Sequence, residues 1–412
     1  MIKKIVVIGA SAACMGFISK LRSFDKQSQV ICFSGESYIP YNRCLLADFV
    51  EQNKNEADIT LKSDDFFAEH QIDLRLNSWV TEINKEEKYV MCNGKQESYD
   101  YLFLGTGTKP FIPAIPGADL TGVFGFHMLA DVAKIDTYIV EHAPKTAVVV
   151  GAGINGIEAA SALISRGLKV TVIDIYDYVM PQQVDKKAAF FIENKMKAAG
   201  VTFFKGQKVI AVLQRNGESV GKIQLSSGAF LPTDCVVLAT GCRVNSDLIL
   251  QTGLAMNDGS VVVDDAMQTS DPSIYAGGDI CAAKDIISKD LVKSVTWSDA
   301  MLQGLTAATQ FSDKPRTYPG IVGLRDSEFF GLEFYACGET VDVEMFDVME
   351  IGKKDYLHKF YLFDGLLQGF VLIGKVENLA KYKTFYLTQQ VIDRSDLCEK
   401  EEVYSLDEQG NE

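Results

Sequence analysis

The apolar positions of the chain form short continuous runs that alternate with amphipathic segments of helical length. Residues 3–33 contain an apolar strand, a turn of small residues, a helix and a second apolar strand. Residues 146–174 repeat this order, with β-branched residues in both strands. A strand, a helix and a further strand in this order form a βαβ unit with parallel strands. The pattern therefore predicts an α/β protein with two such units, about 140 residues apart.

Two further segments resemble each other in the same way. Residues 99–110 and 233–245 each contain an acidic turn, an apolar strand and a Thr-Gly pair. Each follows a stretch with the alternation of antiparallel strands joined by polar turns. Residues 273–283 then place Asp279 at the end of an apolar strand, and residues 294–311 have the periodicity of a helix. Residues 99–110 and 233–245, each with the strands before it, therefore share one order of elements.

From Tyr318 onward the pattern changes to alternating strands. A helix is expected over residues 377–392, followed by a charged tail that we expect to be mobile. The pattern from Tyr318 onward therefore predicts a separate, small α+β domain at the C-terminal end.

Composition and charge narrow the classes of function. Hydrophobic residues make up 47% and charged residues 23%, which is typical of a soluble protein with substantial cores. A net charge of -15 argues against nucleic acid as the main partner, because a phosphate backbone is bound by a basic field. None of the four histidines has metal-binding spacing, so no metal site is expected. Nine single cysteines without a CxxC pair indicate reduced thiols in the cytoplasm; they are Cys14, Cys32, Cys44, Cys92, Cys235, Cys242, Cys281, Cys337 and Cys398.

The N-terminal residues 1–14 allow a second interpretation. Two lysines, an apolar run and small residues before Cys14 also fit a lipoprotein-type signal sequence. The same residues supply the strand and turn that the first βαβ unit needs, so we favour the folded interpretation. No apolar run approaches the roughly 18 residues of a membrane span, and no membrane association is expected.

The second βαβ unit carries a complete dinucleotide fingerprint. Gly151, Gly153 and Gly156 follow the first strand and open the helix, and Asp174 ends the second strand 18 residues after Gly156. In this motif the glycines allow the tight turn, the approach of a pyrophosphate and close helix packing, while the acid binds the adenosine ribose. No arginine follows in residues 175–177 to bind a 2′-phosphate, so NADH is favoured over NADPH.

The first unit has a degraded fingerprint. Gly9 is present, but Ser11 and Cys14 stand where glycines are usual, so this turn alone is a weak signal. Small residues still allow a pyrophosphate to approach the N-terminus of the helix.

With these units in place, the chain resembles the two-dinucleotide flavoprotein oxidoreductases over nearly its whole length. The segments PYNRCLL (40–46), TWSDAMLQG (296–304) and FFGLEFYACGE (329–339) are most similar to the branch of NADH:rubredoxin and ferredoxin reductases. That branch includes the N-terminal half of nitrite reductase large subunits.

The resemblance implies three domains. Residues 1–112 and 240–317 would form a discontinuous FAD-binding domain, 113–239 an NAD-binding domain, and 318–412 the C-terminal α+β domain.

The resemblance also implies roles for residues on the FAD side. Gly9 and Ser11 would approach the pyrophosphate, and Glu36 would hold the FAD ribose. Arg43 and Lys109 would neutralise the FAD phosphates and supply local positive charge in a chain whose net charge is negative. The alternative for each is an ordinary surface charge.

Further cofactor contacts are implied around the flavin. Thr106 and Gly107 would line the flavin site, Asp279 would bond the ribityl chain, and Gly278 would let that chain pass closely. Ala13, in the first turn of the first helix, is assigned to cofactor binding as well.

Three more residues follow from the resemblance. Trp297 would lie near the isoalloxazine, and Glu158 would lie near the nicotinamide. Gly241, in the second Thr-Gly pair, is assigned to cofactor binding. Trp297 could instead be a core aromatic residue and Glu158 part of a solvated helix face.

The sequence departs from the pattern at two positions. Asp48 stands where the ferredoxin-type branch has lysine near the flavin, and Ala12 stands where the peroxidase and oxidase branch has histidine. No paired-cysteine motif or C-terminal His-Glu pair occurs, which puts dithiol reduction and hydroperoxidase chemistry in doubt.

The resulting prediction is an FAD-dependent NADH oxidoreductase that passes electrons to a small redox protein such as a rubredoxin, as a monomer or homodimer. Lysines of the C-terminal domain are candidates for binding an acidic carrier, or they form an ordinary solvated face: Lys353, Lys354, Lys359, Lys375, Lys381 and Lys383.

Two alternatives stay open. Cys44 follows Tyr41 by three residues, as does the redox cysteine of single-cysteine reductases of the coenzyme A-disulfide type, which also makes an NADH oxidase using Cys44 possible. We favour Cys44 as a small apolar filler near the flavin. The other alternative is an FAD- and NADH-binding redox sensor with little turnover.

Overall fold

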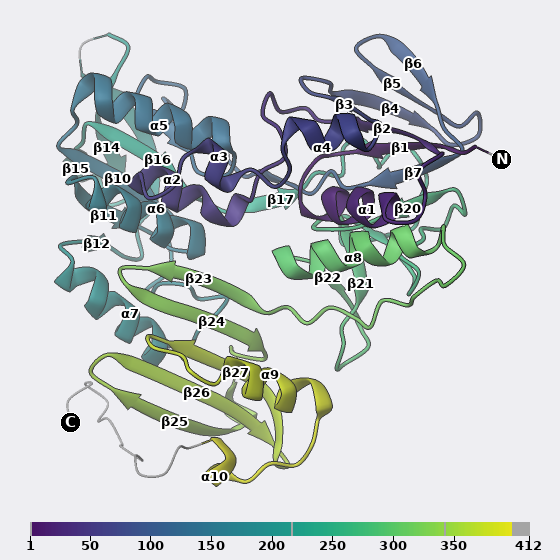
Figure 1. The fold of residues 1–412 in the computed structure, drawn as a ribbon. Coiled ribbons are helices and arrows are strands. Elements are labelled where there is room, and N and C mark those ends of the chain that lie inside the picture. Colours follow the sequence, from purple (N-terminus) through teal and green to yellow (C-terminus); the bar gives the residue numbers. More distant parts are fainter. Residues whose placement is uncertain (1, 216, 342, 398–412) are drawn as a thin grey trace. The chain divides into compact units, whose positions relative to one another are not determined.

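The structure is a computed structural model that describes residues 2–215, 217–341 and 343–397. The predicted charged tail and Cys398 lie outside these residues. The contacts divide the chain into two compact units (Figure 1). The first unit comprises Met1–Arg43, Glu56–Lys109 and Cys242–Gly323, and the second comprises Cys44–Asn55, Pro110–Gly241 and Leu324–Glu412. In the described part of the chain, no helix has the length and apolar character needed to cross a membrane.

A five-stranded parallel sheet forms the centre of the first unit. Its order is β20 (Ile274–Ala276), β7 (Tyr101–Leu104), β1 (Lys4–Ile8), β2 (Gln29–Phe33) and β3 (Ile72–Arg75). The last four residues of β1 and of β2 are buried, so both faces of the sheet are covered. This explains why these strands appear in the sequence as continuous apolar runs.

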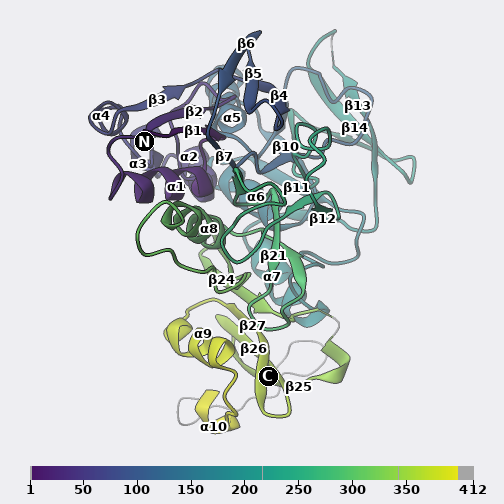
Figure 2. The ribbon, with the colours of Figure 1, turned by 90° about the vertical axis from the view of Figure 1, so that its right-hand side faces the viewer.

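Two helices of the first unit pack unusually closely, α1 (Ala12–Arg22) and α8 (Trp297–Thr309), which lie side by side in Figures 1 and 2. A Cβ built on Gly304 would lie 1.9 Å from the carbonyl oxygen of Ala13. A Cβ built on Gly16 would lie 2.6 Å from the carbonyl oxygen of Met301. Only glycine at these two positions allows the observed approach of the two backbones.

Smaller elements complete the first unit. An antiparallel meander contains β4 (Val80–Asn84), β5 (Tyr89–Cys92) and β6 (Lys95–Ser98). A four-stranded sheet has the order β18 (Met256–Asn257), β19 (Ser260–Val262), β21 (Cys281–Lys284) and β22 (Leu291–Lys293). The remaining elements are α3 (Glu56–Ile59), α4 (Asp64–Glu69), and the paired strands β8 (Thr108–Pro110) and β17 (Cys242–Val244).

The second unit contains a parallel sheet of the same design. Its order is β12 (Thr202–Phe204), β11 (Lys169–Ile173), β10 (Thr146–Val150), β16 (Cys235–Leu238) and β9 (Val123–Gly125). The helices of this part are α2 (Leu46–Glu51), α5 (Leu129–His142), α6 (Ile154–Ser165) and α7 (Lys186–Ala198). An antiparallel meander is formed by β13 (Val209–Gln214), β14 (Val220–Leu225) and β15 (Phe230–Pro232).

The C-terminal part of the second unit has its own antiparallel sheet. Its order is β23 (Arg325–Phe329), β24 (Leu332–Gly338), β27 (Leu366–Ile373), β26 (Tyr356–Phe363) and β25 (Asp347–Lys353). Helix α9 (Leu379–Thr388) packs on β27, and α10 (Arg394–Leu397) follows it.

A buried lysine joins this sheet to α7. Lys359 on β26 is only 2% exposed and forms ion pairs with Asp185 and, at 3.0 Å, with Glu350. Asp185 also caps α7, because its side chain accepts a hydrogen bond from the backbone N–H of Ala188. The inclusion of Lys359 among the lysines that bind a carrier protein is therefore wrong, since its ammonium group is enclosed within the chain.

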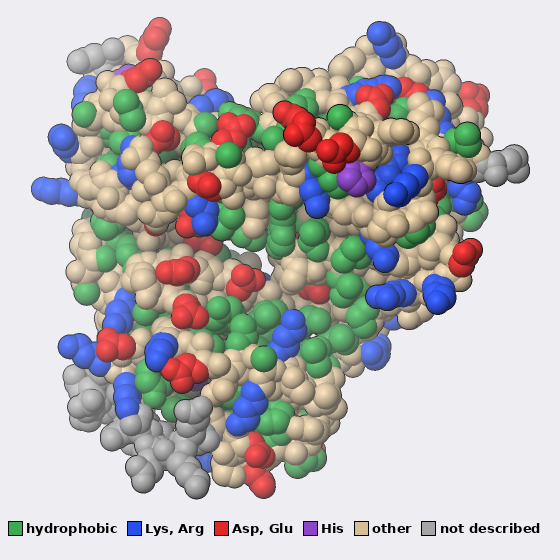
Figure 3. Space-filling view, in the orientation of Figure 1, with side chains coloured by type: hydrophobic (Ala, Val, Ile, Leu, Met, Phe, Trp, Pro, Cys, Tyr) green, Lys and Arg blue, Asp and Glu red, His purple; other side chains and the backbone are tan. Residues whose placement is uncertain are grey.

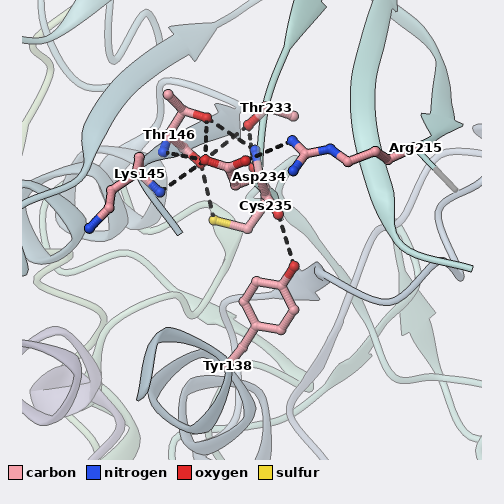
Figure 4. Close-up of polar contacts among 7 residues, drawn as sticks. All are labelled: Tyr138, Lys145, Thr146, Arg215, Thr233, Asp234 and Cys235. Carbon is pink, nitrogen blue, oxygen red and sulfur yellow. Dashed lines mark hydrogen bonds and ion pairs between the residues drawn. The ribbon is translucent and has the colours of Figure 1, made fainter. Parts of the chain in front are cut away.

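The acidic turns that precede β7 and β16 have a structural role. The backbone N–H of Lys4 donates to Asp100 at 2.6 Å, and those of Lys145 and Thr146 donate to Asp234 at 2.9 and 3.0 Å. Figure 4 shows Asp234 surrounded by these donors and by Arg215. Although partial burial opposes it, these hydrogen bonds lower the pKa of Asp234 to about 2. Each acid thus fixes the beginning of the central strand of its sheet.

The predicted elements are present with small shifts at their ends. The helix expected over residues 294–311 spans Trp297–Thr309, because Thr296 caps it by accepting from the backbone N–H of Asp299. The helix expected over 377–392 spans Leu379–Thr388. The assignment of cofactors to the three sequence-derived domains stays a prediction.

Candidate dinucleotide-binding sites

The turn between β1 and α1 has the geometry of a dinucleotide fingerprint. Gly9 has a φ of 108°, and its N–H donates to the carbonyl of Phe33 at 2.8 Å. A Cβ on Gly9 would lie 2.2 Å from the carbonyl oxygen of Gly105, so both conformation and space require glycine. Ser11 is the N-cap of α1, and its side chain makes no capping bond. Ala13 lies buried in the first turn of that helix.

The turn between β10 and α6 repeats this geometry. Gly151 has a φ of 110°, donates to the carbonyl of Ile173 at 2.8 Å, and approaches the carbonyl of Ala239 as Gly9 approaches that of Gly105. Gly153 is the N-cap of α6 with a φ of -74°, and a Cβ there would meet no atom within 4 Å. Neither backbone conformation nor packing explains this glycine. The open space at a helix N-terminus fits the approach of a phosphate.

The residue at the third position of the fingerprint differs between the two turns. In the first turn, a glycine elsewhere in the chain makes room for the larger residue. In the second turn, a Cβ on Gly156 would lie 2.1 Å from the carbonyl oxygen of Gly151. In the first turn the corresponding residue is Cys14, whose thiol is accommodated because Gly105 has no side chain. Burial raises the pKa of the Cys14 thiol to about 12, so it is no nucleophile at neutral pH.

The loops beyond the second strands also correspond. Hydrogen bonds join Ser34 to Arg75, Asn77 to Glu36 and Ser78 to Ser34 in the first unit. The same backbone bonds join Asp174 to Phe204, Gly206 to Tyr176 and Gln207 to Asp174 in the second unit. Residues 34–36 and 75–78 therefore correspond to residues 174–176 and 204–207.

Asp174 is held over the glycine-rich turn of its unit. Its carboxylate accepts from the backbone N–H of Ala152 at 2.5 Å and of Tyr176 at 2.9 Å. In the first unit the corresponding residue is Ser34, and the acidic residue predicted for the ribose, Glu36, stands two positions later. The two units therefore present their carboxylates from different points of the same loop.

Glu36 is bound by two neighbours in its own unit. Its carboxylate forms an ion pair with Arg43 and accepts from the hydroxyl of Tyr41 at 2.6 Å. The sequence analysis gave Glu36 and Arg43 separate roles at the ribose and the phosphates. The structure brings them into contact, with Tyr41 as a third member that the sequence analysis did not assign.

The Thr-Gly segment after β7 lies beside the residues that follow β17. The hydroxyl of Thr106 donates to the carbonyl of Asn245 at 3.3 Å, and the carbonyl of Gly107 accepts from the N–H of Asn245 at 2.9 Å. Lys109 forms an ion pair with Asp247, at a position where both side chains are exposed. Lys109 thus has an acidic partner in the chain itself, in addition to its predicted phosphate.

In the second unit, Gly241 has a φ of 94° and nothing within 4 Å of a built Cβ.

Gly278 is supported by a buried network that the sequence analysis missed. The N–H of Gly278 donates to the side-chain oxygen of Gln303 at 2.7 Å, and Gln303 donates to Tyr318 at 3.3 Å. Asp299 accepts from the Tyr318 hydroxyl at 3.3 Å. The signal was present in the segment TWSDAMLQG, in which Asp299 and Gln303 lie four positions apart and therefore on the same face of the helix.

Asp279 has an unusual acidity for an aspartate. Burial raises the pKa of Asp279 to about 6, although the charge of Arg43 and a hydrogen bond from Thr108 oppose this shift.

Trp297, the first residue of α8, is partly buried and packs against the core of the same unit.

Glu158 lies on α6 in the second unit and contacts the C-terminal sheet. Its carboxyl accepts a hydrogen bond from the Ser327 hydroxyl at 2.6 Å. Burial, with the help of the nearby carboxylates Asp326 and Asp48, raises the pKa of Glu158 to about 7, although the hydrogen bond from Ser327 opposes this shift. The alternative of a freely solvated helix face is therefore wrong for this residue. The carboxylate of Asp48 adds negative charge near Glu158.

Cys44 lies in the short 3-10 helix Arg43–Leu45 and is exposed. The expectation that it packs near the flavin stays a prediction, while in the chain itself its side chain is exposed. Among the described residues, Cys242 is the other exposed cysteine.

Comparisons with known proteins agree with this geometry. Residues 3–304 match the family described as pyridine nucleotide-disulphide oxidoreductase. The chain is 31% identical over 375 residues to an NAD(P)H nitrite reductase of Bacillus subtilis, and the match covers 90% of this chain and 44% of that protein. The chain thus spans less than half the length of that relative.

Two further comparisons cover more of their matches. The chain is 32% identical over 356 residues to rubredoxin-NAD(+) reductase of Pseudomonas putida, which covers 83% of this chain and 91% of that protein. The crystal structure of reduced CoADR-RHD from Bacillus anthracis has a TM-score of 0.87 at 26% identity, covering 95% of this chain and 75% of that one. These findings confirm the predicted fold class and the resemblance to flavoprotein oxidoreductases. The chain belongs to the pyridine nucleotide-disulphide oxidoreductase family.

Proposed function

We propose that this chain is an FAD-dependent NADH oxidoreductase that delivers electrons to a small redox protein. The observation that carries the proposal is the repeat of one turn, Gly9 in the first unit and Gly151 in the second, each leading into a helix. One chain with two such turns is suited to two dinucleotides, one in each unit. When bound, FAD and NADH supply the hydride-transfer chemistry, while the protein binds and orients them.

The residues present fit both cofactors. The open space at Gly153 and the small residues at the N-terminus of α1 leave room for a pyrophosphate. In the first unit, Arg43 and Lys109 add positive charge, and Gly278 and Asp279 stand at the end of a parallel strand, where ligands bind in such sheets. The proposal therefore assigns FAD to the first unit and NADH to the second.

Asp174 supports NADH as the preferred nucleotide. Its carboxylate is fixed by the N–H groups of Ala152 and Tyr176, so it stays in place as a partner for ribose hydroxyls. A 2′-phosphate at the same place would meet a like charge.

A protein acceptor is supported by the name of the Pseudomonas relative, a rubredoxin-NAD(+) reductase. The basic residues available for an acidic carrier are dispersed: Lys354 and Lys381 are exposed, whereas Lys375 is paired with Glu377 at 2.5 Å. On the face shown in Figure 3, basic and acidic side chains are interspersed. Recognition of a carrier would then depend on local pairs of opposite charge.

A second candidate function is thiol chemistry at Cys44. It is favoured by the exposure of this cysteine and by its position beside Arg43, since thiol chemistry requires access and a neighbouring cation favours the thiolate. In this alternative the chain would reduce a small disulfide or persulfide, with Cys44 as the attacking thiol.

The deciding experiment is anaerobic mixing of the purified protein with NADH, followed by a screen of acceptors. We expect yellow protein with about one FAD per chain. Its flavin should bleach within about a second of mixing and recover on addition of oxidised rubredoxin. Colourless protein that takes up no FAD on reconstitution contradicts the proposal. Bleaching over minutes indicates the redox sensor instead.

A further inference from the structure

Trp79 is a large side chain in an unusually open position. It immediately precedes β4 in the first unit and is 61% exposed. Its six-membered ring lies against Gly35, because a Cβ built on Gly35 would be 2.2 Å from Cε3 and 2.6 Å from Cζ3 of the indole. Gly35 does not have a positive φ, so its backbone does not require glycine. The missing side chain instead makes room for the indole.

The segment that carries Trp79 is firmly attached to the loop after β2. The backbone N–H of Ser78 donates to the carbonyl of Ser34 at 2.7 Å, and that of Asn77 donates to the carbonyl of Glu36 at 3.0 Å. Ser78 and Val80, the two sequence neighbours of Trp79, are both buried. The exposed ring is therefore held on a rigid base rather than on a free loop.

The repeat in the chain shows that this pair is special to the first unit. By the matching backbone bonds, Trp79 and Gly35 correspond to Lys208 and Ile175 in the second unit. Packing of the protein alone therefore does not demand an aromatic residue and a glycine at these positions. The difference points to a ligand group that only the first unit receives.

We propose that Trp79 is an aromatic platform on which the adenine of FAD stacks. In a βαβ unit the adenosine lies beyond the end of the second strand, with its ribose at the acidic residue of that loop. Gly35 and Glu36 occupy that loop, and the Trp79 ring covers Gly35. A base and an aromatic ring stack without a need for sequence-specific hydrogen bonds. This inference rests on the proposed binding of FAD to the first unit.

The test is the affinity of the flavin-free protein for FAD. Trp79→Ala should raise the Kd about tenfold, the size typical of one base–aromatic stack, whereas Trp79→Phe should keep it within about threefold of wild type. Phe24→Ala, which removes another exposed aromatic side chain of the same unit, serves as the control and should leave the Kd unchanged. Thermal unfolding of the flavin-free variants checks that all of them fold.

A second readout uses the tryptophan emission directly. The chain has two tryptophans, so Trp297→Phe leaves Trp79 as the sole tryptophan, whose emission is excited selectively over that of the tyrosines. FAD should quench this emission, and ADP, which carries the adenosine without the flavin, should quench it at higher concentration. A Trp79→Ala variant that folds and binds FAD as tightly as wild type overturns the platform alone. A wild-type protein that binds no FAD overturns the proposed function together with it.

Discussion

The sulfur of Cys14 occupies the space that a side chain on Gly105 would need. A Cβ on Gly105 would lie 2.2 Å from the Cys14 Sγ, whereas its next contacts, Phe103 at 3.5 Å and the carbonyl of Ile8 at 3.7 Å, are ordinary. The second unit has the opposite arrangement, with Gly156 on the helix and Ala239 on the strand side. The two positions therefore share one small volume that either residue can fill.

The shared volume predicts that a substitution at one position restores the stability lost through a substitution at the other. Gly105→Ala should destabilise the protein by about 1–3 kcal/mol through overpacking. Addition of Cys14→Ala should recover most of that loss, because it removes the obstructing sulfur. Urea unfolding of the two single variants and the double variant measures the coupling. Equal destabilisation by Gly105→Ala with and without the second change would contradict the shared volume.

The second prediction concerns nucleotide choice. Asp174→Asn removes the charge but keeps one oxygen for the backbone N–H groups of Ala152 and Tyr176. The ratio of kcat/KM for NADH to that for NADPH should fall by about tenfold, since a like-charge penalty of about 1–3 kcal/mol is lost. The control is Asp177→Asn, which removes the same charge at an exposed position three residues later and should leave this ratio unchanged. Equal kcat/KM for the two nucleotides in wild type would refute the role of Asp174.

The third prediction is a dependence of stability on pH. The native Glu158 keeps its proton up to a pKa of about 7, while an unfolded glutamate loses it near 4.5. The native state therefore binds more protons in this window, and stability falls as the pH rises from about 4.5 to 7.

Glu158→Gln should remove this part of the fall, so that the variant gains about 1–2 kcal/mol relative to wild type between pH 5 and pH 8. Urea unfolding at the two pH values measures the difference. Glu141→Gln, at an exposed site on α5, should show no such gain. A wild-type and a Glu158→Gln protein with parallel pH profiles would show that Glu158 is already ionised at pH 5.

The fourth prediction distinguishes the two possible roles of Cys44, an unreactive residue and a second redox centre. In a reductase that uses only the flavin, Cys44→Ser should leave the rate of flavin reduction by NADH within about threefold of wild type. Anaerobic titration should then consume about two electrons per FAD in both proteins. Consumption of about four electrons in wild type, falling to about two in the variant, would identify the thiol as a second redox centre.

Much of the fold could be predicted because it is encoded locally. Continuous apolar runs predicted strands buried on both faces, and the turn glycines Gly9 and Gly151 predicted where each helix begins. The degraded first fingerprint was harder, because the replacement of a glycine by Cys14 is compensated by Gly105, about 90 residues later in the chain.

The side-chain contacts of the candidate site could not be predicted in the same way. The contact of Glu158 with Ser327 joins residues 169 positions apart, and the enclosure of Lys359 depends on Asp185 from α7. Periodicity shows that Lys359 lies on a strand but not which face is covered. Gln303 and Asp299 were visible as polar residues on an apolar helix, yet their partners are set by packing.

The enclosed ammonium group of Lys359 limits how this protein can be shortened. Removal of the C-terminal sheet would strip Asp185 of its cation and open the beginning of α7 to water. A fragment ending before Leu324 would therefore lose the cation of Asp185 and keep only the N-cap hydrogen bond from Ala188 at this helix end.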